Sequence, residues 1–101
     1  MGTKRALSRT ALEVLAAFHQ APADPQYGLQ LMKATGIKAG SLYPILQRFE
    51  DDGWIEAEWE DVDPSQQGRP RRRLYKMTGL GQQVAHAELR RAIGRLAPRW
   101  T

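Results

Sequence analysis

Lys38-Ala39-Gly40-Ser41-Leu42-Tyr43-Pro44-Ile45-Leu46-Gln47-Arg48-Phe49-Glu50-Asp51-Asp52-Gly53 has the pattern of a helix with two unlike faces. Its large apolar residues are spaced by three, one and three positions, which places them on one side of a helix. Small residues at its start would let a helix N-terminus approach another polymer closely, and Gly53 supplies a helix-ending residue. The other side is small, polar and weakly basic. The segment is a candidate recognition helix for DNA, and an ordinary amphipathic surface helix is the alternative.

Pro44 conflicts with a regular helix that begins near Lys38. In such a helix the proline lies in the second turn, where its ring presses towards the carbonyl group of Gly40 and one N–H donor is missing. We therefore expect a tightened or distorted first turn, or a regular helix that begins only near residues 41–43.

Two helices are expected before this segment. Residues 1–7 read as a loose basic arm, and Ser8 is a candidate N-cap for a first helix whose inward side carries Leu12, Leu15 and Phe18. Residues 21–25 break that helix. A second, shorter helix begins at Gln26 or Tyr27 and is closed by Gly36. Because only Ile37 and Lys38 separate it from the amphipathic segment, the arrangement predicts a helix-turn-helix.

After Gly53 the apolar period changes from near 3.6 to two, which is typical of a strand. In residues 54–60, Ile55, Ala57 and Trp59 alternate with three glutamates. A turn-rich loop follows over residues 61–70, and a second strand, residues 71–77, returns with Tyr75 and Met77 on the core side. The pattern predicts a two-stranded antiparallel wing beside the recognition helix.

Charge is separated along the chain. The 101 residues carry a formal net charge of +4, but eight of the 11 acidic residues lie between Glu50 and Asp63, and five basic residues follow within positions 69–76. A hydrophobic content of 42% is ordinary for one globular domain. The absence of cysteine excludes disulfides and cysteine metal sites. We expect a single cytoplasmic domain without a membrane segment.

The last segment predicts a helix from Thr78 to about Ala97. Its apolar stripe exceeds what a small body can cover, so we expect it to pair with the same helix of a second chain. Packing on the first helix of its own subunit is the alternative. We divide the chain into a DNA-binding domain, residues 1–77, and a dimerisation helix, residues 78–101. The expected interface residues are Leu80, Val84, Leu89, Ala92, Ile93, Leu96 and Trp100.

Enzymatic chemistry is not indicated. His19 and His86 are isolated in helical patterns, so no metal site is expected. The alternating Glu56, Glu58 and Glu60 fit a solvated strand face better than acid/base groups. The sequence Gly79-Leu80-Gly81 lacks the third glycine of a dinucleotide fingerprint. We expect no enzyme activity and no cofactor.

Five ordered motifs resemble the PadR family of winged-helix transcriptional regulators. They are Tyr27-Gly28, Ser41-Leu42-Tyr43-Pro44-Ile45-Leu46, Phe49-Glu50-Asp51-Asp52-Gly53, Gly68-Arg69-Pro70-Arg71 and Tyr75-Lys76-Met77-Thr78-Gly79-Leu80-Gly81. The resemblance implies a mainly helical α+β fold, with a winged helix-turn-helix followed by a C-terminal dimerisation helix. It also implies a homodimer that binds double-stranded DNA, usually a repressor, released by a small ligand or by changes at the dimer interface.

The expected DNA contacts come from two elements. On the recognition helix, glutamine and arginine have the donors and acceptors that read base edges, and the wing arginines would contribute salt-sensitive affinity. Tyr43 could instead be a packing residue, and Arg48 could pair with Asp51 or Asp52. The expected contact residues are Lys38, Gly40, Ser41, Tyr43, Pro44, Gln47 and Arg48 of the helix, and Arg69, Arg71, Arg72 and Arg73 of the wing.

Three readings remain open. Gly68-Arg69-Pro70 resembles an AT-hook core, with Gln67 at the position of the usual preceding arginine. The arginine run could also be solvated and balance the acidic strand across the hairpin. Finally, the chain could be a winged-helix protein-interaction module without specific DNA binding. An effector site is not identified, although Trp54, Trp59 and Trp100 are candidates to line an apolar one.

Overall fold

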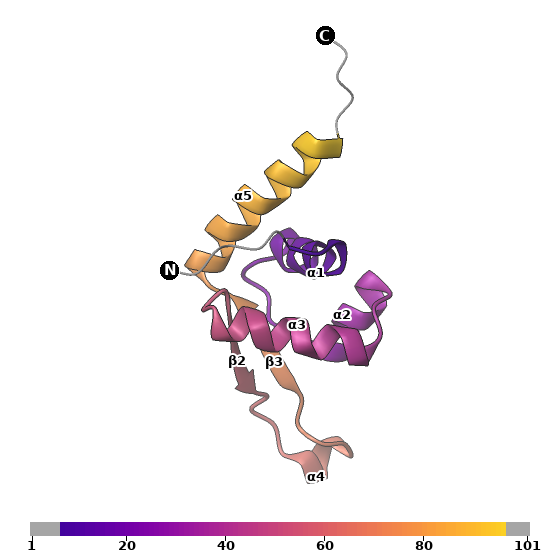
Figure 1. Cartoon of the computed structure of the whole chain (residues 1–101). Coiled ribbons are helices and arrows are strands. Elements are labelled where there is room, and N and C mark those ends of the chain that lie inside the picture. Colours follow the sequence, from indigo (N-terminus) through magenta and orange to yellow (C-terminus); the bar gives the residue numbers. More distant parts are fainter. Residues whose placement is uncertain (1–6, 97–101) are drawn as a thin grey trace.

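A computed structural model describes residues 7–96 of the chain. Three helices form the body, a small antiparallel sheet leads into the wing, and a long helix leaves the body at the opposite end (Figure 1). The elements in chain order are α1 (Arg9–Gln20), β1 (Gln26–Tyr27), α2 (Gly28–Thr35), α3 (Ala39–Asp51), β2 (Ile55–Trp59), α4 (Pro64–Gln67), β3 (Arg73–Met77) and α5 (Gly79–Leu96).

The first helix begins where its sequence predicts. The Ser8 Oγ accepts a hydrogen bond from the Ala11 N–H at 3.1 Å, so one of the free amides of the first turn is satisfied. Val14, Leu15 and Phe18 are fully buried on one side of α1. Each such side chain contributes about 1.5–3 kcal/mol of burial free energy.

The helix-turn-helix is confirmed. At the start of α2 the Gln30 side chain accepts a hydrogen bond from the Tyr27 N–H at 2.9 Å. Leu31 fixes α2 on the body, and Leu42, Leu46 and Phe49 do the same for α3; all four are buried. α3 ends before Gly53, whose φ of 77° is the left-handed conformation that glycine tolerates best.

The conflict at Pro44 is resolved by a tightened first turn. α3 is continuous from Ala39, with Pro44 inside it. The amides of Ser41 and Leu42 both donate to the Lys38 carbonyl, at 3.0 and 2.9 Å, so a short three-residue bond overlaps the ordinary four-residue one. The expected alternative of a helix that begins only near residues 41–43 is not observed.

The sheet has three strands in the order β1-β3-β2, all antiparallel. The predicted wing strands are confirmed, with Ile55 opposite Met77 and Trp59 opposite Arg73. β1 adds a third strand that the sequence did not predict, because two residues are too few to show a period. Trp59 is on the side of Ile55 as expected, but it is 59% exposed because β2 extends past the body at this point.

The wing loop contains a one-turn helix, α4, which was predicted as irregular turns. The Asp63 Oδ1 accepts from the Ser65 N–H at 2.9 Å, and Pro64 follows the cap at the first helical position. Proline there loses no helical bond, since its N–H would have no partner in any case. No apolar residue of this turn is buried, so hydrophobic periodicity could not reveal it.

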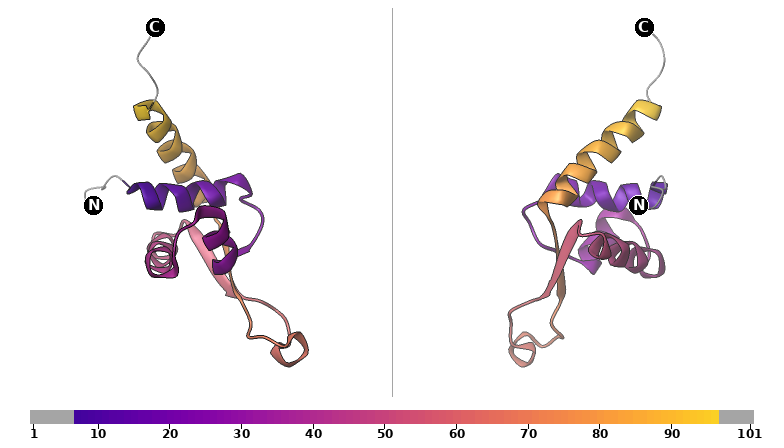
Figure 2. Two further views of the ribbon diagram at one scale, coloured as in Figure 1. Left: turned by 90° about the vertical axis from the view of Figure 1, so that its right-hand side faces the viewer. Right: turned by 60° about the vertical axis from the view of Figure 1, so that its left-hand side comes forward.

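Hydrogen bonds attach the N-terminus of α5 to the body. The Thr78 N–H donates to the Trp54 carbonyl at 3.0 Å, and the Thr78 Oγ accepts from the Gly81 N–H at 2.9 Å as the expected N-cap. α5 then packs across α1. All views in Figures 1 and 2 show it extending from the body on the side away from the wing.

Within residues 7–96, none of the helices combines the length and the apolar character needed to cross a membrane.

Candidate nucleic-acid interface

The outward side of α3 is free of body contacts along most of its length. The predicted contact residues on this helix are exposed: Lys38, Gly40, Ser41, Tyr43, Pro44, Gln47 and Arg48. The Gln47 Nε2 donates to the Asp51 Oδ1 at 2.9 Å, and the Arg48 Nε lies 3.8 Å from the Asp52 Oδ2, one of the two pairings predicted. Solvent-exposed pairs of this kind contribute only about 0–1 kcal/mol, so both side chains can exchange these partners for others.

Tyr43 both packs and remains accessible. Its side chain leans onto the first residue of α2, and a Cβ added to Gly28 would overlap the Tyr43 hydroxyl and lie 2.8 Å from its Cζ. At the same time Tyr43 is 45% exposed. The pair Tyr27-Gly28 in the sequence thus has a steric reason: only a residue without a side chain leaves room for Tyr43 there.

An ion pair joins the two ends of the wing loop. The Arg69 Nη1 and Nη2 donate to the two Glu60 carboxylate oxygens at 2.7 and 3.1 Å, and the side chains of Arg69 and Glu60 are only 28% and 18% exposed. This two-pronged geometry is the strongest that arginine and carboxylate form. Hydrogen bonding from Arg69 lowers the pKa of the Glu60 carboxyl, and the same bond raises the pKa of Arg69.

The next two arginines are held without an acidic side chain. The Arg71 Nε donates to the Val62 carbonyl at 2.9 Å, and Arg71 is exposed. The Arg72 guanidinium carbon lies 4.1 Å from the centre of the Tyr27 ring. Such contacts orient a cation while its full positive charge remains.

Arg73 joins the wing to α3. Its Nη2 donates to the Glu50 Oε2 at 3.4 Å, and its guanidinium carbon lies 5.2 Å from the Trp59 ring centre. The neighbouring Tyr75 is buried, and this burial, followed by the nearby Tyr43 hydroxyl, raises the pKa of the Tyr75 phenol. The sequence showed that acidic residues gather between Glu50 and Asp63, but it did not identify Glu50 or Glu60 as site residues.

The apolar residues of α5 that were expected to form a dimer interface do not all face solvent: some pack on the body of their own chain and others are exposed. Gly81 and Ala85, which the stripe omitted, are buried, and Leu89 packs against the core. A Cβ on Gly81 would overlap the Trp54 carbonyl oxygen. Leu80 and Ile93 are 51% and 66% exposed, and Val84 and Ala92 are half-buried. The side chain of Leu96 and all of Trp100 lie outside the described residues.

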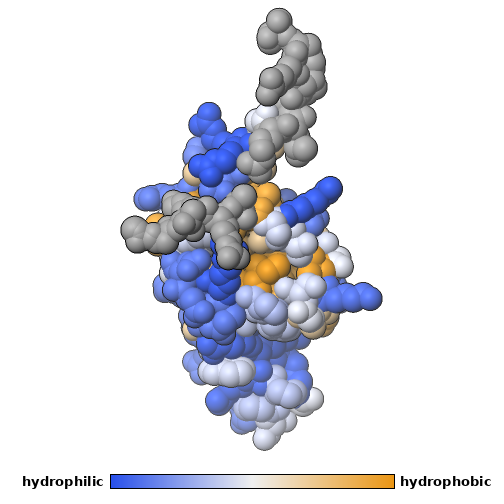
Figure 3. Space-filling view, in the orientation of Figure 1, coloured by the Kyte–Doolittle hydropathy of each residue, from blue (hydrophilic) through white to orange (hydrophobic). Residues whose placement is uncertain are grey.

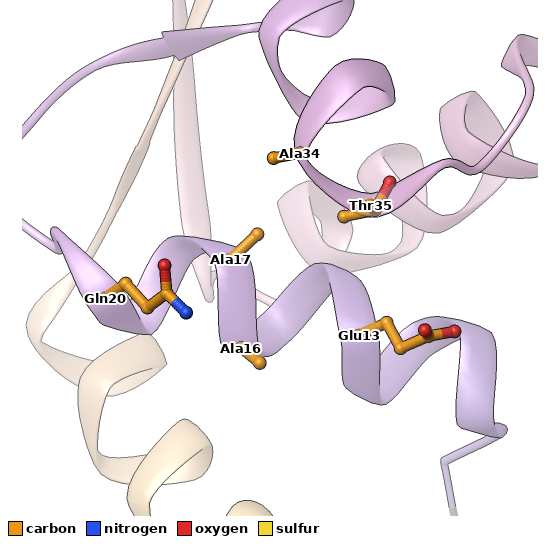
Figure 4. Close-up of a pocket in the computed structure, with 6 residues that line it drawn as sticks. All are labelled: Glu13, Ala16, Ala17, Gln20, Ala34 and Thr35. Atoms are coloured by element: carbon orange, nitrogen blue, oxygen red, sulfur yellow. The ribbon is translucent and has the colours of Figure 1, made fainter.

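Trp54 and Trp59, the two candidate tryptophans within the described residues, do not line a common ligand site. Trp54 packs on Phe49 with ring centres 5.1 Å apart, whereas Trp59 lies at the far end of β2 beside Arg73. A different hollow of about 220 Å³ lies between α1 and α2 (Figure 4). Figure 4 shows that methyl groups and short side chains line much of it; the lining residues are Glu13, Ala16, Ala17, Gln20, Ala34 and Thr35.

Surface hydropathy differs between the wing and the body. In Figure 3 the wing, at the lower end, is covered mainly by hydrophilic and neutral side chains, and apolar surface gathers on the middle of the body. Among residues 7–96, no three His, Cys, Asp or Glu side chains are grouped so that they could hold a metal ion.

A compact helix-turn-helix whose second helix is exposed, followed by a hairpin that carries four arginines, defines the winged helix-turn-helix class of proteins. The model of the transcriptional regulator PadR-like family matches residues 14–87, and the chain belongs to this family. Members of the family regulate transcription and are not enzymes.

Solved structures share the fold. A PadR-like transcription factor from Bacteroides fragilis is 22% identical, with a TM-score of 0.63 over 86% of this chain and 88% of its own. The protein smu.1704 from Streptococcus mutans UA159 is 23% identical, with a TM-score of 0.69 over 92% and 86%. Reduced AbfR bound to DNA is 22% identical, with a TM-score of 0.70 over 92% of this chain and 59% of its own; another AbfR structure is from Staphylococcus epidermidis.

The chain spans 57–62% of the length of the AbfR chains that it matches. A sequence search finds no significant match among curated proteins.

Proposed function

We propose that the chain is a homodimeric, sequence-specific DNA-binding repressor of the PadR type, relieved by a small ligand. The observation that carries the proposal is the exposed polar side of α3 beside a wing with four arginines. The major groove of B-DNA admits a helix. α3 would lie in that groove with Gln47 and Arg48 towards base edges, and Lys38, Ser41 and Tyr43 towards flanking phosphates.

The small residues at the start of α3 support close approach to DNA. Gly40 has no heavy atom within 4 Å of the position that a Cβ would take, and Ser41 is exposed beside it. No packing within the body therefore requires a small residue at position 40. A DNA backbone close to the helix N-terminus provides a reason, because free N–H groups there favour an anion. AbfR, which shares the fold, has been crystallised with DNA.

Pairing of two chains would involve α5. Ile93, four residues after the core-packed Leu89, is the most exposed large apolar residue of the described chain. A second copy would cover it, and a two-fold pair would present two copies of α3 to half-sites about one helical turn apart. Relief by a ligand rests on the family resemblance.

A salt titration tests DNA binding. The wild-type chain is titrated with DNA from its own promoter, and Gln47→Ala and Arg48→Ala are compared with it. We expect affinity to fall steeply with salt, and each variant to lose about 1–3 kcal/mol of discrimination against altered base pairs. Absence of sequence-selective binding at low salt would favour the protein-interaction module instead.

A further inference from the structure

We propose that the four wing arginines divide into two roles. Arg69 and Arg73 are positioning residues that fix the wing through the carboxylates of Glu60 and Glu50. Arg71 and Arg72 supply the wing's contacts to DNA phosphates. This assignment rests on the proposed function and deepens it, because it names which wing residues meet the DNA.

Glu60 closes the base of the wing loop. Its carboxylate accepts two bonds from Arg69 and a third from the Arg72 N–H at 3.2 Å. Its own N–H donates to the Arg72 carbonyl at 2.8 Å, which extends the β2–β3 pairing beyond the strands. One carboxylate therefore holds both ends of the loop together, and these ends cannot separate without breaking these bonds.

Arg73 fixes the direction of the wing. Glu50 belongs to α3 and lies 23 positions before Arg73, so their bond connects the recognition helix with the first residue of β3. The Trp59 ring, directly across the strand pair, covers the same guanidinium. Together these contacts set where the wing stands relative to α3.

The charges that remain belong to the other two residues. Among residues 7–96, Arg71 and Arg72 form no ion pair, whereas Arg69 and Arg73 each form one. Residues 60–73 contain four arginines and three carboxylates, so the net positive charge of the wing is small. If Arg69 turned to a phosphate, it would leave the Glu60 carboxylate unpaired beside the DNA, which is repulsive.

Salt dependence separates the two roles. The probe is a duplex that the wild-type chain enriches from a random pool, or a random-sequence duplex at low salt if none is enriched. Arg71→Gln and Arg72→Gln should each reduce the slope of log affinity against log salt by about 0.9 per bound chain, or about 1.8 for a dimer on two half-sites, because each removes one phosphate contact from every chain. Arg69→Gln and Arg73→Gln should weaken binding while the slope stays at the wild-type value. A slope reduced by Arg69→Gln or Arg73→Gln as much as by Arg71→Gln would overturn the division.

Glu60→Gln gives opposite outcomes for the two possible roles of Arg69. The matched control is Glu58→Gln, which removes the same charge two residues earlier, from an exposed position in β2. If Arg69 is a positioning residue, Glu60→Gln binds DNA more weakly than the control. If Glu60 merely competes with DNA for Arg69, Glu60→Gln binds more tightly than the control and its salt slope steepens.

A measurement without DNA separates this proposal from the proposed function. Amide hydrogen exchange over residues 61–72 should speed up in Arg69→Gln and Glu60→Gln and stay at the wild-type rate in Arg72→Gln, because the Arg72 side chain contacts Tyr27 and not the loop. The exchanged pair Glu60→Arg with Arg69→Glu should restore part of the slow exchange: the ion pair is rebuilt, whereas the bond from the Arg72 N–H has no acceptor in arginine. If the wild-type chain binds no duplex but the exchange pattern holds, the proposed function fails while the positioning role stands; unchanged exchange in Arg69→Gln would refute the positioning role alone.

Discussion

Tyr43 shows how one exposed side chain constrains a position in another helix. Its hydroxyl and ring occupy the space above Gly28, so the first residue of α2 must lack a side chain. Tyr43 is thereby held at the junction of α2 and α3 while almost half of its surface stays accessible. The packing and DNA-contacting interpretations of Tyr43 are therefore compatible.

Gly28→Ala should displace Tyr43 and weaken DNA binding while the chain still folds. The new methyl group overlaps the tyrosine hydroxyl, but the φ of Gly28 is not positive, so alanine there restricts the unfolded chain and stabilises the fold by about 0.4–1 kcal/mol. In a Tyr43→Ala background, the same change should only stabilise the fold. Urea unfolding and duplex titration of the four chains measure both effects; equal effects of Gly28→Ala in the two backgrounds would show that the contact is unimportant.

Glu60 should make wing stability depend on pH in the acid range. Its pKa lies below the ordinary value of 4.5 in the folded chain, chiefly because Arg69 donates to it. The stabilisation is thus present above that ordinary value and is lost as pH falls through the lowered one. The difference in unfolding free energy between wild type and Glu60→Gln should vanish at low pH, and a difference constant with pH would contradict this prediction.

α3 combines a regular buried side with a disturbed start. Pro44 removes the N–H that would bond to Gly40, and the bond from Ser41 to Lys38 tightens the turn before it. The side chain of Pro44 is exposed, so packing does not require it. A local rule broken on an exposed helix side is consistent with a functional surface.

Pro44→Ala should stabilise the domain. The substitution restores one helical hydrogen bond and removes a ring clash, together worth up to about 3 kcal/mol in a helix interior. Urea unfolding measures the gain, and Ala34→Pro in the exposed last turns of α2 is the reverse control, which should destabilise. An unchanged midpoint for Pro44→Ala would mean that α3 accommodates the proline without cost.

The elements could be predicted from sequence where a period was long enough to read. α1, α3, β2 and β3 each bury residues at the spacing of their type, and α2 is bounded by a cap and a glycine. β1 and α4 were missed because neither has an apolar period. The exposed side of α3 followed from the same helical spacing. The ion-pair partners of Arg69 and Arg73 could not be predicted from sequence, because they depend on strand register and on how α3 packs against the sheet.

The whole molecule places α5 and the wing at opposite ends of a small body (Figure 2). Leu80 and Ile93 are both exposed, yet at 3.6 residues per turn they lie about 140° apart around α5. Leu89, in contrast, packs on its own core. A second chain would therefore meet the far end of α5, near Ile93, and not the full predicted stripe.

Ile93→Arg should convert the proposed dimer to a monomer without unfolding the chain, because Ile93 is 66% exposed in one chain. The control is Ala87→Arg, which adds the same charge on the exposed side of α5 that carries Arg90 and Arg91. Sedimentation equilibrium measures the mass, and duplex titration should show weaker binding for Ile93→Arg alone. A wild-type chain that is monomeric at high concentration would contradict the pairing.

Selection of bound duplexes from a random pool tests DNA recognition by paired chains most directly. The wild-type chain is incubated with the pool, bound duplexes are amplified over several rounds, and Gln47→Ala/Arg48→Ala is carried through in parallel. We predict enriched sites made of two inverted half-sites with centres about 34–36 Å apart along the duplex, and loss of that enrichment for the double variant. Enrichment of no common sequence, or the same sequence for both chains, would contradict recognition through α3.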